Sequence, residues 1–207
     1  MNDNLIFISG PQGAGKTTLI KIILEKIPNT MSPKIKTKSP QYYWGEYSMG
    51  EINYFHRQAL KYAQRASEIY EYHIIAAKFP ERIILGDRCM IDEEIYRQVN
   101  LDLGWITAEQ KEEIGTKLNI LLLKEYLDPK IIIINPPMEI LSKHLEKRRK
   151  ETGWEKFGEK NMKFVEGSRK RFSELKGRKR TLYIEEEFNS EDYSLIKKIG
   201  DWMLNSN

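Results

Sequence analysis

Residues 4–18 read Asn-Leu-Ile-Phe-Ile-Ser-Gly-Pro-Gln-Gly-Ala-Gly-Lys-Thr-Thr, and the rest of the chain is interpreted outward from them. Residues 5–8 are apolar on both faces of an extended chain, as expected for a buried parallel strand. From Gly10 to Thr17 the sequence matches the phosphate-loop pattern Gly-x-x-x-x-Gly-Lys-Thr. Apolar residues then recur over 19–27 at the spacing of a helix packed on a sheet. Strand, loop and helix therefore occur in the order that a phosphate-binding loop requires.

The residue types of this loop each suit the binding of phosphate. Glycine lets backbone N–H groups turn inward around phosphate oxygens, and the positive end of the following helix attracts the same anion. Lys16 would contact the β- and γ-phosphates, and the Thr17 hydroxyl would bind Mg²⁺. The sequence therefore predicts a nucleoside triphosphate site, with ATP as phosphate donor. The predicted ATP-binding residues are Gly10, Pro11, Gln12, Gly13, Ala14, Gly15, Lys16, Thr17 and Thr18.

Length and composition favour a single soluble domain over residues 1–207. The chain has 207 residues, of which 31% are charged, and a net charge of +4. Its one cysteine, Cys89, excludes an internal disulfide and fits a reducing compartment. The three histidines show no metal-ligand spacing with it. Since no apolar run is as long as a membrane span and the N-terminus lacks a basic leader, we expect a cytoplasmic protein without membrane contact.

Strands and helices are expected to alternate along the whole chain. Further strands are predicted at residues 34–37, 82–87, 130–134 and 181–184. Helices are predicted at residues 51–79, 91–99, 107–127 and 190–204, and another after Pro136-Pro137. This alternation predicts a three-layer α/β fold of the P-loop NTPase class, with a parallel sheet of about five strands and helices on both faces.

The long helix at residues 51–79 follows a capping box that starts at Ser48. Its predicted core stripe consists of Ile52, Phe55, Ala59, Ala63, Ala66 and Tyr70. A second stripe holds Gln58, Lys61 and Arg65, which form either a solvated face or the wall of a cleft. The aromatic residues of the preceding loop, Tyr42, Tyr43, Trp44 and Tyr47, either cover the core or stack on a nucleobase.

Two charged features are placed by this topology near the phosphate loop. Asp87 and Arg88 end a buried strand, and ligands of open α/β sheets bind at the carboxyl ends of strands. Cationic residues also concentrate between residues 143 and 180. They form either a solvated helix pair or a basic lid, at about residues 148–160, that closes over a triphosphate.

Two classes of phosphate-loop protein lack support in this sequence. A GTPase needs an Asn-Lys-x-Asp motif after a strand, and the nearest match, Asn135-Pro-Pro-Met, does not fit. A motor ATPase usually carries an Asp-Glu pair at a strand end, which neither Asp87-Arg88 nor Ile134-Asn135 supplies. A kinase that acts on a small molecule remains.

The order of these motifs resembles the thymidylate kinase family, within the wider group that also holds the deoxynucleoside kinases. The phosphate loop comes first, and residues 62–65, Tyr-Ala-Gln-Arg, resemble the Ala-x-Arg element of the family's long helix. Gly86-Asp87-Arg88 follows at the usual interval, with Tyr96 where the family often has a tyrosine. Residues 127–137 resemble the strand before the lid, and residues 154–175 resemble the lid and the helix after it. The resemblance covers nearly the whole chain.

The resemblance implies roles for three residues. The residue like Arg65 contacts the acceptor's base, the one like Arg88 contacts its phosphate, and the one like Asp87 lies beside the magnesium. The chain also departs from the family pattern: Lys38 replaces a phosphate-binding arginine, Gln12 an aspartate, Lys61 a base-stacking phenylalanine and Gly158 an acid of the lid. Lysine cannot form the two-pronged contact of arginine, so these departures bear on the acceptor and leave the donor chemistry intact.

The expected activity is an ATP- and Mg²⁺-dependent transfer of the γ-phosphate to a deoxynucleoside monophosphate, thymidylate first. The predicted catalytic residues are Lys16, Asp87, Arg88, Arg148, Arg149 and Lys156, and Thr17 and Asp87 are the predicted metal ligands. The predicted acceptor-binding residues are Lys38, Gln58, Lys61, Arg65, Arg88 and Glu93.

Two alternatives stay open. The spacing of Gln58 and Glu93 resembles the base-reading set of deoxynucleoside kinases, whose acceptor is a neutral 5′-hydroxyl. A nucleotide-binding protein without turnover is the other alternative. The expected partner is a small nucleotide or nucleoside, nucleic acid is not expected, and a homodimer is left open.

Overall fold

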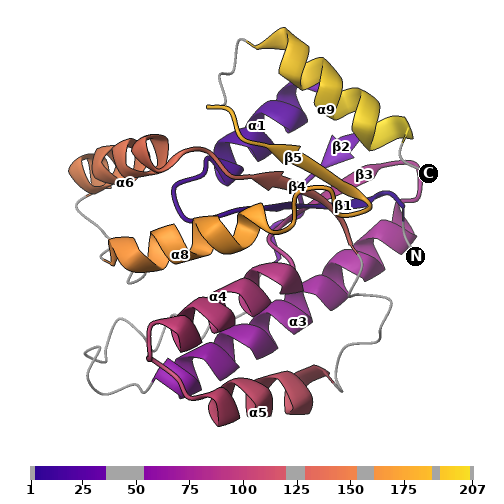
Figure 1. Ribbon diagram of the computed structural model, residues 1–207. Coiled ribbons are helices and arrows are strands. Elements are labelled where there is room, and N and C mark those ends of the chain that lie inside the picture. The colour runs from indigo at the N-terminus through magenta and orange to yellow at the C-terminus, as the bar shows by residue number, and fades with distance from the viewer. Residues whose placement is uncertain (1–2, 36–53, 120–128, 153–160, 188–191, 206–207) are drawn as a thin grey trace.

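A parallel sheet of five strands, in the order β2-β3-β1-β4-β5, forms the centre of the computed structural model (Figure 1). The structure describes residues 3–35, 54–119, 129–152, 161–187 and 192–205. The strands are β1 (Leu5–Ser9), β2 (Thr30–Met31), β3 (Ile83–Asp87), β4 (Lys130–Ile134) and β5 (Thr181–Ile184). The helices are α1 (Lys16–Lys26), α3 (Tyr54–Lys78), α4 (Met90–Asp102), α5 (Ala108–Asn119), α6 (Met138–Thr152), α8 (Met162–Ser173) and α9 (Tyr193–Asn205).

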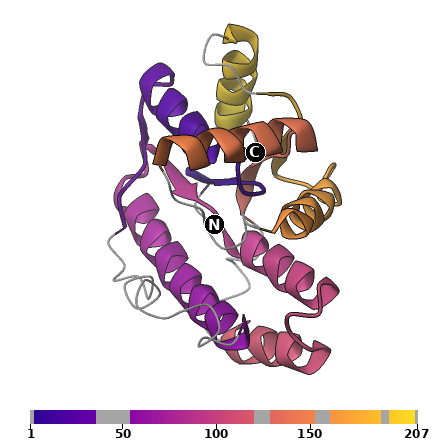
Figure 2. The same ribbon diagram turned by 90° about the vertical axis from the view of Figure 1, so that its left-hand side faces the viewer.

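Strand β1 is central because both of its faces are apolar. Leu5 and Phe7 enter the core beneath α3, α4 and α8, while Ile6 and Ile8 enter the core beneath α1, α6 and α9. Helix α5 packs outside α3 and α4, and the sheet lies between the two helical layers (Figures 1 and 2). These layers confirm the predicted three-layer α/β fold.

The second strand lies earlier in the chain than predicted. We expected it at residues 34–37, but β2 is the two-residue segment Thr30–Met31, which pairs with Ile83 and Ile84 of β3. Residues 34 and 35 are not in a strand, and residues 36–37 lie outside the described residues. The chain reaches the sheet within a few residues of the end of α1, and Pro33 then has no N–H to continue the ladder.

The buried face of α3 is also displaced from the prediction. Ala63 and Tyr70, which we expected in the core, are exposed, and the Tyr70 side chain is 57% accessible to solvent. Tyr62 and Ile69, one position earlier, are buried instead. Packing against α4 rotates the helix so that the buried line also includes the polar Gln58. The predicted helix start at residues 48–52 and the aromatic loop at 42–47 lie outside the described residues.

The other predicted elements lie close to their expected positions. Thr107 and Gln110 exchange backbone-to-side-chain hydrogen bonds of 3.0 and 3.2 Å before α5, which confirms the predicted capping box. The predicted extension of this helix to residue 127 lies outside the described residues. Within the described residues, none of the helices is both long enough and apolar enough to cross a membrane.

Candidate functional site

The phosphate loop follows β1 directly and requires glycine at defined points. Gly10, Gly13 and Gly15 have φ angles of +142°, +82° and +90°, which side chains other than hydrogen rarely allow. A Cβ at Gly10 would lie 2.1 Å from the carbonyl oxygen of Ile134 on the neighbouring strand. The loop therefore sits tightly against the end of β4, and its backbone, not its side chains, forms the surface.

Lys16 closes this loop from the first turn of α1. Its side chain is buried, and its ammonium donates hydrogen bonds of 2.8 and 2.7 Å to the carbonyl oxygens of Gly10 and Pro11. No side chain caps the N-terminus of α1 and no acidic residue lies in its first turn. A helix start of this kind, with a glycine at the N-cap and no acid in the first turn, suits an anionic ligand, as at known phosphate sites. All nine predicted ATP-binding residues lie in this loop and first turn.

Asp87 and Arg88 lie beside the loop, as the strand order requires. Asp87 is exposed at the end of β3 and pairs in register with Ile8 of β1. Arg88 donates its backbone N–H to the Ile8 carbonyl at 3.0 Å and has a φ angle of +70°. A left-handed backbone at a residue other than glycine costs energy and is retained where the surroundings impose it. The turn aims the Arg88 side chain at α4.

The Arg88 guanidinium contacts Tyr96, a residue of α4. Arg88 Nη1 donates to the Tyr96 hydroxyl at 2.6 Å, and the guanidinium carbon lies 5.2 Å from the centre of the tyrosine ring. The same hydroxyl donates to the carbonyl oxygen of Gly10 at 3.4 Å. Burial raises the pKa of the Tyr96 hydroxyl, so it stays protonated as this donor. Tyr96 therefore connects Arg88 to the first residue of the phosphate loop.

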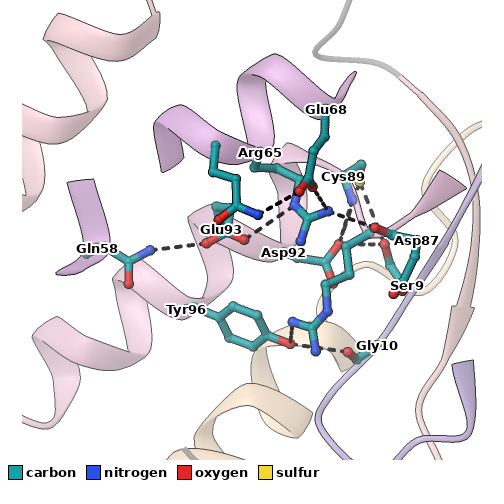
Figure 3. Close-up of polar contacts among 12 residues, drawn as sticks. Ser9, Gly10, Gln58, Arg65, Glu68, Asp87, Cys89, Asp92, Glu93 and Tyr96 are labelled. Carbon is teal, nitrogen blue, oxygen red and sulfur yellow. Dashed lines mark hydrogen bonds and ion pairs between the residues drawn. The ribbon is translucent and has the colours of Figure 1, made fainter. Parts of the chain in front are cut away.

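Asp92 is a buried carboxylate that the sequence analysis missed. Its Oδ2 accepts hydrogen bonds from the Ser9 hydroxyl at 2.6 Å and from the Cys89 backbone N–H at 3.0 Å (Figure 3). Its Oδ1 is buried and has no hydrogen-bond partner among the described residues. Burial raises the pKa of the Asp92 carboxyl, and the nearby Arg88 charge opposes that rise. Its sequence signal was weak, since the N-terminal residue of this capping box is Cys89 and not serine or threonine.

A second polar cluster lies between α3 and α4, next to Arg88. Gln58 Nε2 donates to Glu93 Oε2 at 3.4 Å (Figure 3). The Oε1 of Gln58 accepts from Asn100 Nδ2 at 2.8 Å. All three side chains are buried. Because the Glu93 carboxylate only accepts, the NH₂ group of Gln58 must point toward Glu93 and its oxygen toward Asn100. The orientations of both side-chain amides are thereby fixed. The structure thus brings together Gln58 and Glu93, as predicted, and adds Asn100.

Arg65 joins this cluster to the end of β3. It donates to Glu68 Oε2 at 2.6 Å and to the Asp87 carbonyl at 2.8 Å, and its Nε lies 3.6 Å from Glu93 Oε1. Burial would lower the pKa of Arg65, but the Glu93 and Glu68 carboxylates outweigh burial and raise it. Glu68 was not predicted as a site residue.

The predicted cations of the lid are described only in part. Arg148 and Arg149 lie near the end of α6, and the pKa of Arg148 is lowered by burial and by the charge of Arg88. Arg148 therefore lies close enough to Arg88 for the two charges to interact. Lys61 is half-buried on α3. Lys38 and Lys156 lie outside the described residues.

Known proteins resemble this chain in two ways: solved structures share its fold, and one kinase matches part of its sequence. Deoxyadenosine kinase from M. mycoides with bound dCTP superposes with a TM-score of 0.68, at 19% identity, covering 94% of this chain and 96% of that one. The same kinase with bound dATP gives 0.67 at 20% identity, with the same coverage. This likeness shows that the chain has the fold of a phosphate-loop kinase.

In sequence, a guanylate kinase of Idiomarina loihiensis is 28% identical over 156 residues, which is 70% of this chain. The match spans 64% of the length of that guanylate kinase. No protein-family model matches the sequence.

Proposed function

We propose that this protein is an ATP- and Mg²⁺-dependent kinase that phosphorylates the 5′ end of a nucleoside or of its monophosphate. One observation carries the proposal: the phosphate loop lies across the sheet edge from the buried polar cluster of Gln58, Glu93 and Arg65. The loop suits a triphosphate, and amide, carboxylate and guanidinium groups suit the edge of a base. The M. mycoides kinase of the same fold and the guanylate kinase match support this class of reaction.

The donor side of the reaction rests on the loop and the first turn of α1. Lys16 and the backbone N–H groups of the loop would hold the β- and γ-phosphates, and Arg148, Arg149 and Lys156 would neutralise charge on the transferred group. Thr17 and Asp87 are exposed oxygen ligands on adjacent elements, which fits Mg²⁺ bound through one or two protein oxygens plus nucleotide and water. The metal would neutralise negative charge on the phosphates as it shifts during transfer.

A deoxynucleoside is the acceptor that the charges of the site favour. Around the acceptor cluster lie the carboxylates of Glu68, Asp87, Asp92 and Glu93, against the cations Arg65 and Arg88. This balance disfavours a dianionic acceptor and supplies a base for a neutral hydroxyl, whose proton must leave during transfer. With this acceptor, Asp87, exposed at the sheet edge beside the loop, would serve as that base, and Mg²⁺ would then be held by Thr17, the nucleotide and water.

A deoxynucleoside monophosphate, thymidylate first, is the second candidate. The observation that favours it is the proximity of Arg148 to Arg88, since two like charges held near each other are stabilised by an anion between them. An acceptor phosphate would supply that anion. Lys38 would then add a further cation from outside the described residues.

An acceptor panel decides between these readings. The protein is mixed with ATP, Mg²⁺ and each of the four deoxynucleosides or their monophosphates, and ADP is measured. We expect one deoxynucleoside to have kcat/KM at least about tenfold above its monophosphate, a difference of about 1.4 kcal/mol. Preference for dTMP or another monophosphate would replace our first candidate with the second. If none of these acceptors increases ADP formation, a nucleotide-binding protein without kinase turnover remains.

Variants of the cluster assign the acceptor site. Glu93→Gln removes the charge that holds Arg65 but keeps the shape, so we expect KM for the acceptor to rise about tenfold, with KM for ATP unchanged. Glu71→Gln, an exchange of the same type on α3, serves as the matched control. Equal effects of Glu93→Gln on both substrates would remove Glu93 from the acceptor site.

A further inference from the structure

Helix α6 packs directly on the middle of the phosphate loop. A Cβ at Gly13 would lie 3.0 Å from the Leu145 side chain and 3.2 Å from the Leu141 carbonyl, so glycine is required there for space as well as for its φ angle of +82°. His144 lies on the same turn of α6. Its Nδ1 is 2.9 Å from the Gly13 carbonyl oxygen, and its Nε2 is 3.3 Å from Oε1 of Glu187, which follows β5.

The nature of these partners fixes the imidazole. A carbonyl oxygen only accepts, so Nδ1 of His144 must carry the hydrogen that lies toward Gly13. The Glu187 carboxylate also only accepts, but its contact is longer, 3.3 Å against 2.9 Å, so we assign the hydrogen of the neutral ring to Nδ1. The Glu187 contact becomes an ion pair when Nε2 also carries a hydrogen. Among the described residues these two groups are the polar partners of His144.

The Gly13 contact adds to the hydrogen bonds that other side chains make to carbonyls of the loop. Those of Gly10 and Pro11 are held by Lys16, and that of Gly13 is held by His144. Glycine loses more conformational freedom than any other residue when it is fixed, so a loop with Gly13 already held binds its ligand with less loss of entropy. Arg148, on the next turn of α6, is thereby placed relative to the loop.

We propose that His144 is a positioning residue of the donor site, which holds the Gly13 carbonyl through its Nδ1–H and so preorganises the phosphate loop for ATP. That the ligand is ATP rests on the proposed function, whereas the contact between His144 and Gly13 does not. Because His144 acts before the ligand arrives, its loss should weaken the binding of ATP without slowing the chemical step.

The test uses three variants and the full chain. His144→Ala removes the bond, His144→Asn places an amide N–H where Nδ1 stood, and His56→Ala, an exposed histidine of α3, is the control. Calorimetry gives Kd for ATP, and steady-state assays give KM and kcat. We expect His144→Ala to weaken ATP binding about tenfold with kcat and acceptor KM unchanged, while His144→Asn stays within about threefold of wild type. His56→Ala should match wild type.

A second measurement does not depend on activity. Long-range ¹⁵N–¹H spectra of the wild-type protein report which ring nitrogen carries hydrogen, with His144→Asn identifying the signal. We expect the Nδ1–H form whenever His144 is neutral. An Nε2–H tautomer, or unchanged ATP affinity in His144→Ala, overturns the inference. Failure of wild type to bind ATP would instead overturn the proposed function, and the tautomer would still decide the role of His144.

Discussion

Lys16 shows how a single residue is prepared for a ligand. Its buried ammonium is satisfied by two loop carbonyls, so its charge is already desolvated and aimed along the loop. A triphosphate would offer the same group stronger, charged acceptors. Preorganised charge of this kind is usually a large contributor to phosphoryl transfer.

Lys16→Ala should therefore lower kcat/KM to less than about a tenth of wild type, through loss of charge stabilisation in the transition state. Lys21→Ala, an exposed lysine on the same helix, is the control and should retain activity. Circular dichroism and thermal melting check that both variants are folded. Full activity in folded Lys16→Ala would refute the assignment of the phosphate loop.

Asp92 makes stability depend on pH with a defined sign. Burial raises the pKa of its carboxyl in the folded state above the ordinary value of 3.8, so the folded protein holds the proton more tightly than the unfolded chain does. The free energy of unfolding contributed by Asp92 is then fully present at pH below 3.8 and is lost as pH rises through the folded-state pKa.

Asp92→Asn removes this titration. We expect wild type to lose stability relative to Asp92→Asn as pH rises from the acid range to neutrality, because only wild type must ionise a buried group. Urea unfolding of both proteins across that range measures the difference. Parallel pH profiles would show that the Asp92 carboxyl does not titrate with a raised pKa.

At the scale of elements, α8 packs on the part of α4 that contacts Arg88. Asn161 caps the helix by accepting from the backbone N–H groups of Lys163 and Phe164, at 3.1 and 3.4 Å. Phe164 packs on the Tyr96 ring, with the ring centres 5.5 Å apart. The start of α8 is therefore tied to the tyrosine that contacts Arg88.

Asn161→Ala should lower the free energy of unfolding by about 1 kcal/mol, through loss of the capping acceptor. Asn161→Asp keeps an acceptor and adds a charge that favours the helix N-terminus, so it should be at least as stable as wild type. Urea denaturation compares the three proteins. Equal losses in both variants would mean that the cap contributes nothing and that Asn161 acts through other contacts.

Strands, helices and loops could be predicted from the sequence where a short stretch of residues carries its own pattern. Strands β1 and β4 are apolar runs buried on both faces, and the glycine spacing of the loop is specific by itself. Strand β2 was misplaced because two residues carry no periodicity, and only pairing with β3 defines them. The buried face of α3 was misjudged at Tyr70, whose aromatic ring suggested the core while the polar Gln58 is the residue that packs on α4.

At the scale of the whole molecule, the site depends on contacts between distant segments. Gln58 and Glu93 could be proposed together from their resemblance to known kinases, whereas the partners Asn100, Asp92 and His144 could not. Each of these three acts through a contact set by tertiary packing, as when α6 approaches Gly13. The spacing of residues along the sequence does not reveal which distant segments contact each other in the fold.

Binding of Mg²⁺ and ATP should stabilise the whole fold. At a ligand concentration about 100-fold above Kd, mass action contributes about 2.7 kcal/mol, which corresponds to a rise in Tm of about 6 °C or more for a chain of this size. Lys16→Ala should show little of this rise because it lacks the charge that holds the phosphates. Thermal scans with and without nucleotide measure both, and the same rise in Lys16→Ala would place the nucleotide elsewhere.

The central position of β1 has a consequence for synthesis of the chain. Leu5 pairs with Ile84 and Ile6 with Lys130, so β1 leaves the ribosome before either of the strands that flank it in the sheet. Until β3 and β4 emerge, its apolar residues and unpaired backbone are open to other chains, since parallel pairing over long separations forms slowly. A chaperone that binds the nascent chain at this stage would protect the strand on which the completed sheet is assembled.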